Sequence, residues 1–200
     1  MKHVCKVLFF SLFLIGCNST LERNDSTQYD KGSFNQLTKT DFDRMADYEI
    51  KENTESLRIL ALKFYKRNPA ELRKTTSDSP EVTVNWLFSS QHGWKFKEIN
   101  NAQGIEALDQ VFDENFKGDR VLSLITGLYT MLITAHDEKK EFDMFDSLDP
   151  QLIYNAARNV EIIVWRLSTK RKENGELFLV TNEINGDLQN LTFEREFGKI

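Results

Sequence analysis

Cysteine, proline and glycine are all scarce in this chain of 200 residues, which contains two, three and nine of them, respectively. So few prolines and glycines argue against a low-complexity chain or one dominated by loops. No paired-cysteine spacing and no His-Glu-x-x-His motif is present, so the sequence contains no recognisable metal site. The length suggests one domain, or one domain with a tail.

A hydrophobic run long enough to cross a bilayer is also missing. The run from Val7 to Ile15 would rise about 14 Å as a helix, against about 30 Å for a hydrocarbon core. The uncharged run from Val121 to Ala135 is also too short, and it is rich in Ser and Thr. A helix that is apolar nearly all round is typically a buried central helix. We therefore expect a central helix over 121–135, with a neighbouring helix packed closely against Gly127.

Positive charge is in the minority, with 26 basic and 31 acidic residues and a formal charge of −5. An acidic body has no broad field that attracts phosphate backbones, so we do not expect nucleic acid as a partner.

The first sixteen residues have the layout of an export signal. Lys2 and Lys6 precede the short apolar run, and no alanine occurs before Ala46 to form an Ala-x-Ala cleavage site. The stretch Leu14-Ile15-Gly16-Cys17 instead resembles the lipobox of bacterial lipoproteins. This resemblance implies that the Cys17 thiol receives a diacylglyceryl group and that the chain is cut just before it. The triplet Cys17-Asn18-Ser19 leaves open cleavage by an ordinary signal peptidase.

Cysteine usage agrees with the lipobox. Cys5 would be removed with the signal, leaving Cys17 as the only thiol, and a lone exported thiol is a liability for wrong pairing. Two or three acyl chains hold a protein stably on a membrane. In such lipoproteins an Asp after the Cys favours the inner membrane. Asn18 therefore implies anchoring in the outer membrane, with the body facing the periplasm.

The sequence divides into three parts. We expect a lipoprotein signal peptide over 1–16, a lipidated flexible tether over 17–39 and a single α-helical domain over 40–200. Residues 18–39 are polar and lack apolar periodicity, which predicts a disordered linker. Its root-mean-square span would be about 25 Å.

The body reads as mainly α, an irregular helical domain of about six to seven helices. Capping residues, prolines and apolar spacing predict these elements. Residues 82–88 alternate like a strand but follow a helix-start signal, so both structures stay open, with helix favoured. Residues 177–184 fit a strand or an extended cover segment. The expected helices cover residues 40–50, 53–67, 104–116, 121–135, 150–169 and a short final stretch containing Phe193 and Phe197.

Three segments of the body are similar to segments of small, uncharacterised proteobacterial lipoproteins. They read "FKGDRVLSLITGLYTMLITAH", "LDPQLIYNAARNVEIIVWRL" and "NLTFEREFGKI". The resemblance covers about half of the chain and implies an envelope location, but it brings no activity with it.

Chemical motifs are sparse. His92 and His136 lie far apart in the sequence, and the acids between 143 and 149 lack the alternation and the glycine of a calcium loop. No nucleophile elbow, phosphate loop or dinucleotide fingerprint occurs. We therefore expect neither a cofactor nor a metal, and no enzymatic activity.

One polar set stands out, on the expected helix that begins after Asp149-Pro150. Its members lie away from the apolar face of that helix, and Arg158 and Glu161 are spaced to form an ion pair. A solvated face is the simpler interpretation, and a surface for a partner is the functional one. The set comprises Asn155, Arg158, Asn159, Glu161, Ile162, Trp165 and Arg166.

These patterns lead to one hypothesis and one alternative. The hypothesis is a lipid-anchored, non-enzymatic binding or scaffold protein of the cell envelope, with a protein partner there. The alternative is a hydrolase that acts on an envelope or cell-wall substrate. A cleft that gathers Arg158, Glu161 and a His or Asp would favour the hydrolase, whereas an exposed apolar patch would favour the binding protein.

Overall fold

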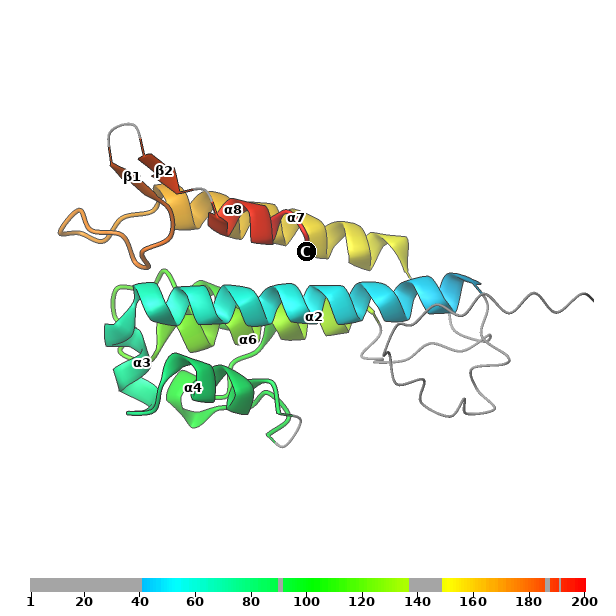
Figure 1. Cartoon of the computed structure of the whole chain (residues 1–200), viewed down its shortest axis with the longest axis horizontal. Helices are drawn as coiled ribbons and strands as arrows, with labels where there is room; N and C mark the ends of the chain where they lie inside the picture. Colours follow the sequence, from blue (N-terminus) through cyan, green and yellow to red (C-terminus); the bar gives the residue numbers. More distant parts are fainter. Residues whose placement is uncertain (1–40, 90–91, 137–148, 186–187, 191) are drawn as a thin grey trace, which may run out of the picture. The chain divides into compact units, whose positions relative to one another are not determined.

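The computed structural model describes residues 41–89, 92–136, 149–185, 188–190 and 192–200 (Figure 1). All of them belong to one unit, Ser33–Ile200. The expected signal and tether, with Cys17, lie outside the described residues. The elements, in chain order, are α2 (Asp41–Arg67), α3 (Pro69–Thr75), α4 (Pro80–Leu87), the short 3-10 helix η1 (Lys97–Ile99), α5 (Gly104–Gln110), α6 (Arg120–Ala135), α7 (Pro150–Thr169), β1 (Glu183–Asn185), β2 (Leu188–Asn190) and α8 (Thr192–Phe197). Seven α-helices among the described residues confirm the mainly α prediction.

The uncharged run forms the central helix, as expected. Twelve of the sixteen residues of α6 are buried, and the helix packs against α2, α5 and α7. A Cβ atom on Gly127 would lie 2.7 Å from Leu108 Cγ and 2.9 Å from the Gly104 carbonyl oxygen. The prediction of a close neighbour at Gly127 is confirmed, and that neighbour is α5.

One prediction was wrong at the start of the domain. We expected two helices, over 40–50 and 53–67, but α2 is continuous through both. The side chain of Thr54, which resembles a cap, donates to the Ile50 carbonyl oxygen at 2.7 Å. Its hydroxyl is thus satisfied inside the helix and does not begin a new one.

The helix expected over 104–116 is shorter than predicted, since α5 ends at Gln110. The Arg120 guanidinium donates to the carbonyl oxygens of Val111 and Asp113 at 3.1 and 2.8 Å. Carbonyl groups just beyond the end of α5 are therefore satisfied by a side chain from farther along the sequence.

The structure shows the conformation of the two segments, 82–88 and 177–184, for which the sequence left alternatives open. Residues 82–88 are helical within α4 up to Leu87, and the Ser79 hydroxyl accepts from the Val82 amide at 3.3 Å. Residues 177–184 are not helical: Leu177 forms a bridge with Arg171, Phe178 and Leu179 form a bend, and β1 begins at Glu183. The antiparallel pairing of β1 with β2 was not predicted.

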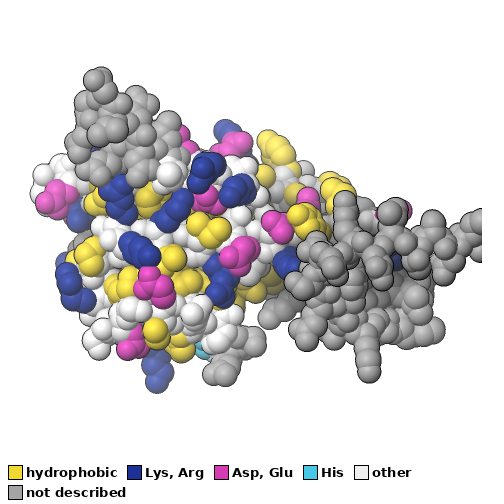
Figure 2. Space-filling view, viewed as in Figure 1, with side chains coloured by type: hydrophobic (Ala, Val, Ile, Leu, Met, Phe, Trp, Pro, Cys, Tyr) yellow, Lys and Arg dark blue, Asp and Glu magenta, His cyan; other side chains and the backbone are white. Residues whose placement is uncertain are grey.

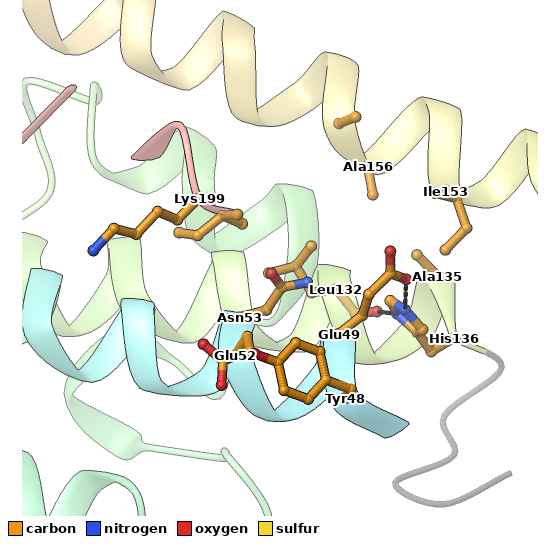
Figure 3. Close-up of a pocket in the computed structure, with 12 residues that line it drawn as sticks. Tyr48, Glu49, Glu52, Asn53, Leu132, Ala135, His136, Ile153, Ala156 and Lys199 are labelled. Carbon is orange, nitrogen blue, oxygen red and sulfur yellow. Dashed lines mark hydrogen bonds and ion pairs between the residues drawn. The ribbon is translucent and has the colours of Figure 1, made fainter. Parts of the chain in front are cut away.

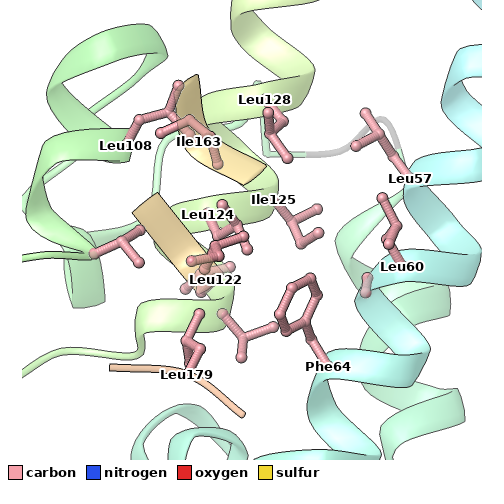
Figure 4. Packing of buried hydrophobic residues seen from close by; sticks show 14 of the residues in the cluster. Leu57, Leu60, Phe64, Leu108, Leu122, Leu124, Ile125, Leu128, Ile163 and Leu179 are labelled. Carbon is pink, nitrogen blue, oxygen red and sulfur yellow. The ribbon is translucent and has the colours of Figure 1, made fainter. Parts of the chain in front are cut away.

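The core lies where α2, α6 and α7 meet (Figure 4). Phe64 from α2, Ile125 from α6 and Ile163 from α7 are all buried there. Segments far apart in sequence close the core, because Leu108 of α5 and Leu179, between α7 and β1, are buried in the same cluster. Burial of these side chains is the main favourable term for folding.

A buried carboxylate begins the central helix. Asp119 is fully buried and accepts hydrogen bonds from the Val121 and Leu122 amides at 2.8 and 3.0 Å. It also accepts from the Tyr65 and Thr75 hydroxyls at 3.0 and 2.8 Å. The carboxylate therefore joins α2, α3 and α6. Burial nevertheless raises the pKa of Asp119 from 3.8 to about 6, because loss of water disfavours the charged form.

The final helix α8 is attached to α2 by rings and by charge. The ring centroids of Phe64 and Phe193 are 4.7 Å apart, and those of Phe64 and Phe197 are 6.2 Å apart. Lys63 reaches the buried Glu196 carboxylate at 3.6 Å, and Lys199 contacts it at 2.7 Å. This arrangement confirms the predicted short helix that contains both phenylalanines.

Candidate functional site

Helix α7 forms as the sequence predicts. The Asp149 carboxylate accepts from the Gln151 amide at 2.8 Å, and Pro150 occupies the first turn. Both features stabilise a helix start. The inner face of α7 is buried through Ala156, Val160, Ile163 and Leu167.

The opposite side of α7 is exposed to solvent and contains two aromatic rings. Tyr154 is 64% exposed and Trp165 is 62% exposed, with Ile162 near them at 41%. Between the rings, the exposed Arg158 and Glu161 form the predicted ion pair. We call Tyr154, Arg158, Glu161, Ile162 and Trp165 the outer face of α7.

The other residues of the predicted set lie at the border of this face or away from it. Asn155 is exposed and accepts from the Gln151 side chain at 2.8 Å, while Asn159 is partly buried. Arg166 instead pairs with Asp109 at 2.7 Å and lies over the Phe112 ring. Arg166 therefore belongs to the contact between α5 and α7. Tyr154 was missed, although it lies four residues before Arg158 and so shares its face.

A pocket of about 290 Å³ lies on the other side of α7 (Figure 3). Its apolar wall includes Leu132, Ile153 and Ala156, and its polar residues include Glu52 and Lys199. Residues from α2, α6, α7 and the C-terminal end thus line one small cavity.

The side chain of His136 lies at this pocket and is almost fully buried. Its Nδ1 donates to the Leu132 carbonyl oxygen at 2.8 Å, and its Nε2 is 3.9 Å from Glu49 Oε2. A histidine near a carboxylate is an arrangement that general acid–base catalysis can use. Among the described lining residues, however, no Ser, Thr or Cys provides a nucleophile.

Arg158 and Glu161, which were expected to line a cleft if the protein were a hydrolase, do not line this pocket. Arg158 and Glu161 are exposed on the outer face of α7, whereas α7 contributes Ile153, Ala156 and Ala157 to the pocket. Within the described ranges, no group of three or more His, Cys, Asp or Glu side chains is placed to hold a metal ion.

The surface charges on the face seen in Figure 2 are mixed. Lysine and arginine side chains alternate there with aspartate and glutamate, and hydrophobic side chains lie between them. No described helix combines the length and the apolar character needed to cross a membrane.

Comparison with known proteins gives no match: no protein family, no curated protein and no solved structure is significantly similar to this chain.

Proposed function

We propose that this chain is a lipid-anchored envelope protein whose helical domain binds a protein partner through the outer face of α7. The observation that carries the proposal is the exposure of Tyr154 and Trp165 on either side of an Arg–Glu pair. Aromatic residues and arginine account for most of the binding energy at protein interfaces. Neither ring is needed to fill the core, so both are available to a partner.

The anchor in this proposal is the acylated Cys17, in the outer membrane and with the domain facing the periplasm. Its support is the lipobox-like stretch after a short signal and the absence of any other cysteine beyond the signal. A tether of about 25 Å would let the domain reach a partner above the headgroups.

Replacing Cys17 by serine should abolish fatty-acid incorporation and release the protein into the soluble fraction, because serine lacks the thiol that is acylated. Metabolic labelling with a radioactive fatty acid, followed by fractionation, measures both effects. Cys5→Ser is the matched control, since that cysteine lies in the segment expected to be removed, and it should stay labelled and membrane-bound. Unchanged labelling of Cys17→Ser would refute the anchor.

The binding surface can be tested by site-specific photocrosslinking in intact envelopes. A photoreactive residue in place of Trp165 should give a crosslinked protein product, because that side chain lies in the proposed interface. The same residue in place of Ile105, which is 48% exposed on α5, is the control and should give none. A product from Ile105 alone, or from neither position, would contradict binding through α7.

One observation favours the alternative function, a hydrolase: His136 lies near Glu49 at the pocket. An enzyme that uses this pair should turn over cell-wall fragments and lose that activity in Glu49→Gln. Such turnover in the purified full-length protein would replace the binding proposal.

A further inference from the structure

We propose that the partner of the outer face of α7 is the same face of a second copy of this chain, with the two helices antiparallel about a two-fold axis. This inference rests on the proposed function, because it names the partner of that same surface.

The spacing of the outer face is that of a helix-pairing seam. Tyr154, Arg158, Glu161 and Trp165 follow one another at intervals of four, three and four residues. Alternating intervals of three and four keep side chains in one line along a helix, as in coiled coils. With a rise of 1.5 Å per residue, the four positions extend over about 17 Å.

The residues of this seam are placed symmetrically about its midpoint, so that two antiparallel copies of the seam complement each other. Tyr154 and Trp165 are equally far from the midpoint between Asn159 and Val160, and so are Arg158 and Glu161. A two-fold axis through that midpoint places each Arg158 opposite Glu161 of the second copy. It also places each Tyr154 opposite Trp165 of the second copy. In such an interface residue i contacts j, and j contacts i.

Charge selects the antiparallel arrangement. A parallel pair in register would place Arg158 against Arg158 and Glu161 against Glu161, and like charges across an interface are unfavourable. In the antiparallel pair each arginine lies near two carboxylates, its own Glu161 and that of the second copy. The outer face thus carries both halves of a complementary charge pattern.

The proposed axis also falls at the centre of the helix. Helix α7 runs from Pro150 to Thr169, so its midpoint is the midpoint of the seam, and two antiparallel copies overlap along their full length. The next seam positions, Gln151 and Ser168, are polar and exposed, and they face each other across the same axis. Polar residues at both ends suit the solvated rim of an interface.

One helix from each copy makes a small interface, below the size of standard stable complexes. We therefore expect weak pairing at low concentration. Anchoring on one membrane would raise the effective concentration of the two copies and strengthen the pairing without new contacts.

The test is a charge exchange in the full-length protein, purified in detergent micelles and produced with two different affinity tags. Co-capture of one tagged form by the other measures self-association. Arg158→Glu and Glu161→Arg should each weaken self-association at least tenfold, since each creates like-charged contacts across the axis. A mixture of the two variants should associate like the natural protein, because every contact between them is again between opposite charges.

The charge control is Arg73→Glu, which changes an exposed arginine on α3 and should leave co-capture unchanged. All three substituted residues are on the surface, so circular dichroism should show the same fold throughout. No co-capture of the natural protein, no effect of either single exchange, or no recovery in the mixture would each overturn the inference. If the photoreactive residue at position 165 crosslinks to a different protein and self-association is absent, the result supports the proposed binding surface and refutes self-pairing.

Discussion

Replacing Asp119 by alanine should lower the free energy of unfolding by about 3–5 kcal/mol, as expected when a buried hydrogen-bond network is broken. Two backbone amides and the hydroxyls of Tyr65 and Thr75 all donate to this carboxylate. Alanine leaves these donors without an acceptor where water is excluded, and it leaves a cavity between α2, α3 and α6. Urea denaturation followed by circular dichroism measures the loss.

The matched control is Asp149→Ala. Both aspartates cap the start of a helix, but Asp149 is exposed, so water can replace its side chain. Loss of an exposed cap costs about 1 kcal/mol. Equal losses at the two positions would show that the buried network around Asp119 adds nothing to ordinary capping.

The same carboxylate should make stability depend on pH. Burial raises the pKa of Asp119 from 3.8 to about 6 in the folded chain. The folded state therefore binds the proton more tightly than the unfolded state. The resulting contribution to the free energy of unfolding is fully present below about pH 4. It is lost as the pH rises through 6, and a pKa difference of this size corresponds to about 3 kcal/mol.

Asp119→Asn removes the titrating group and keeps one oxygen as an acceptor. Unfolding measured at a series of pH values between 4 and 7 should show a smaller decline for this variant than for the natural chain. Glu196 acts in the opposite direction, because Lys199 lowers the pKa of that carboxyl, so its contribution is lost only as the pH falls. Identical pH profiles for the two proteins would contradict the raised pKa of Asp119.

Phe64→Ala should lower the free energy of unfolding by about 3–5 kcal/mol, the usual cost of removing a buried phenylalanine ring. The ring is fully buried and contacts both Phe193 and Phe197. Its loss should also free α8 from α2, because those rings hold the short helix in place. Hydrogen exchange should therefore show faster exchange in residues 193–200 than in α6.

Phe64→Leu is the control for this second prediction. Leucine refills most of the volume, so the cost should fall below about 1.5 kcal/mol and α8 should keep its protection. If alanine destabilised the whole chain without a selective increase in exchange at α8, the ring contacts would not be what holds that helix.

The sequence determined the features that depend on neighbours within a few residues. Asp149 with Pro150 and Ser79 with Pro80 begin helices where expected, because caps act on amides two or three positions away. The uncharged run predicted the buried helix α6. The pairing of Arg158 with Glu161 followed from their spacing alone.

Only the tertiary structure decided the features that join distant segments. Arg120 donates to the Val111 carbonyl oxygen just beyond the end of α5, and Asp109, 57 positions before Arg166, draws that arginine away from the outer face of α7. His136 comes near Glu49 only because α2 and α6 pack side by side. A local pattern contains no information about such partners, since they meet only once burial of the apolar faces has set how the helices pack.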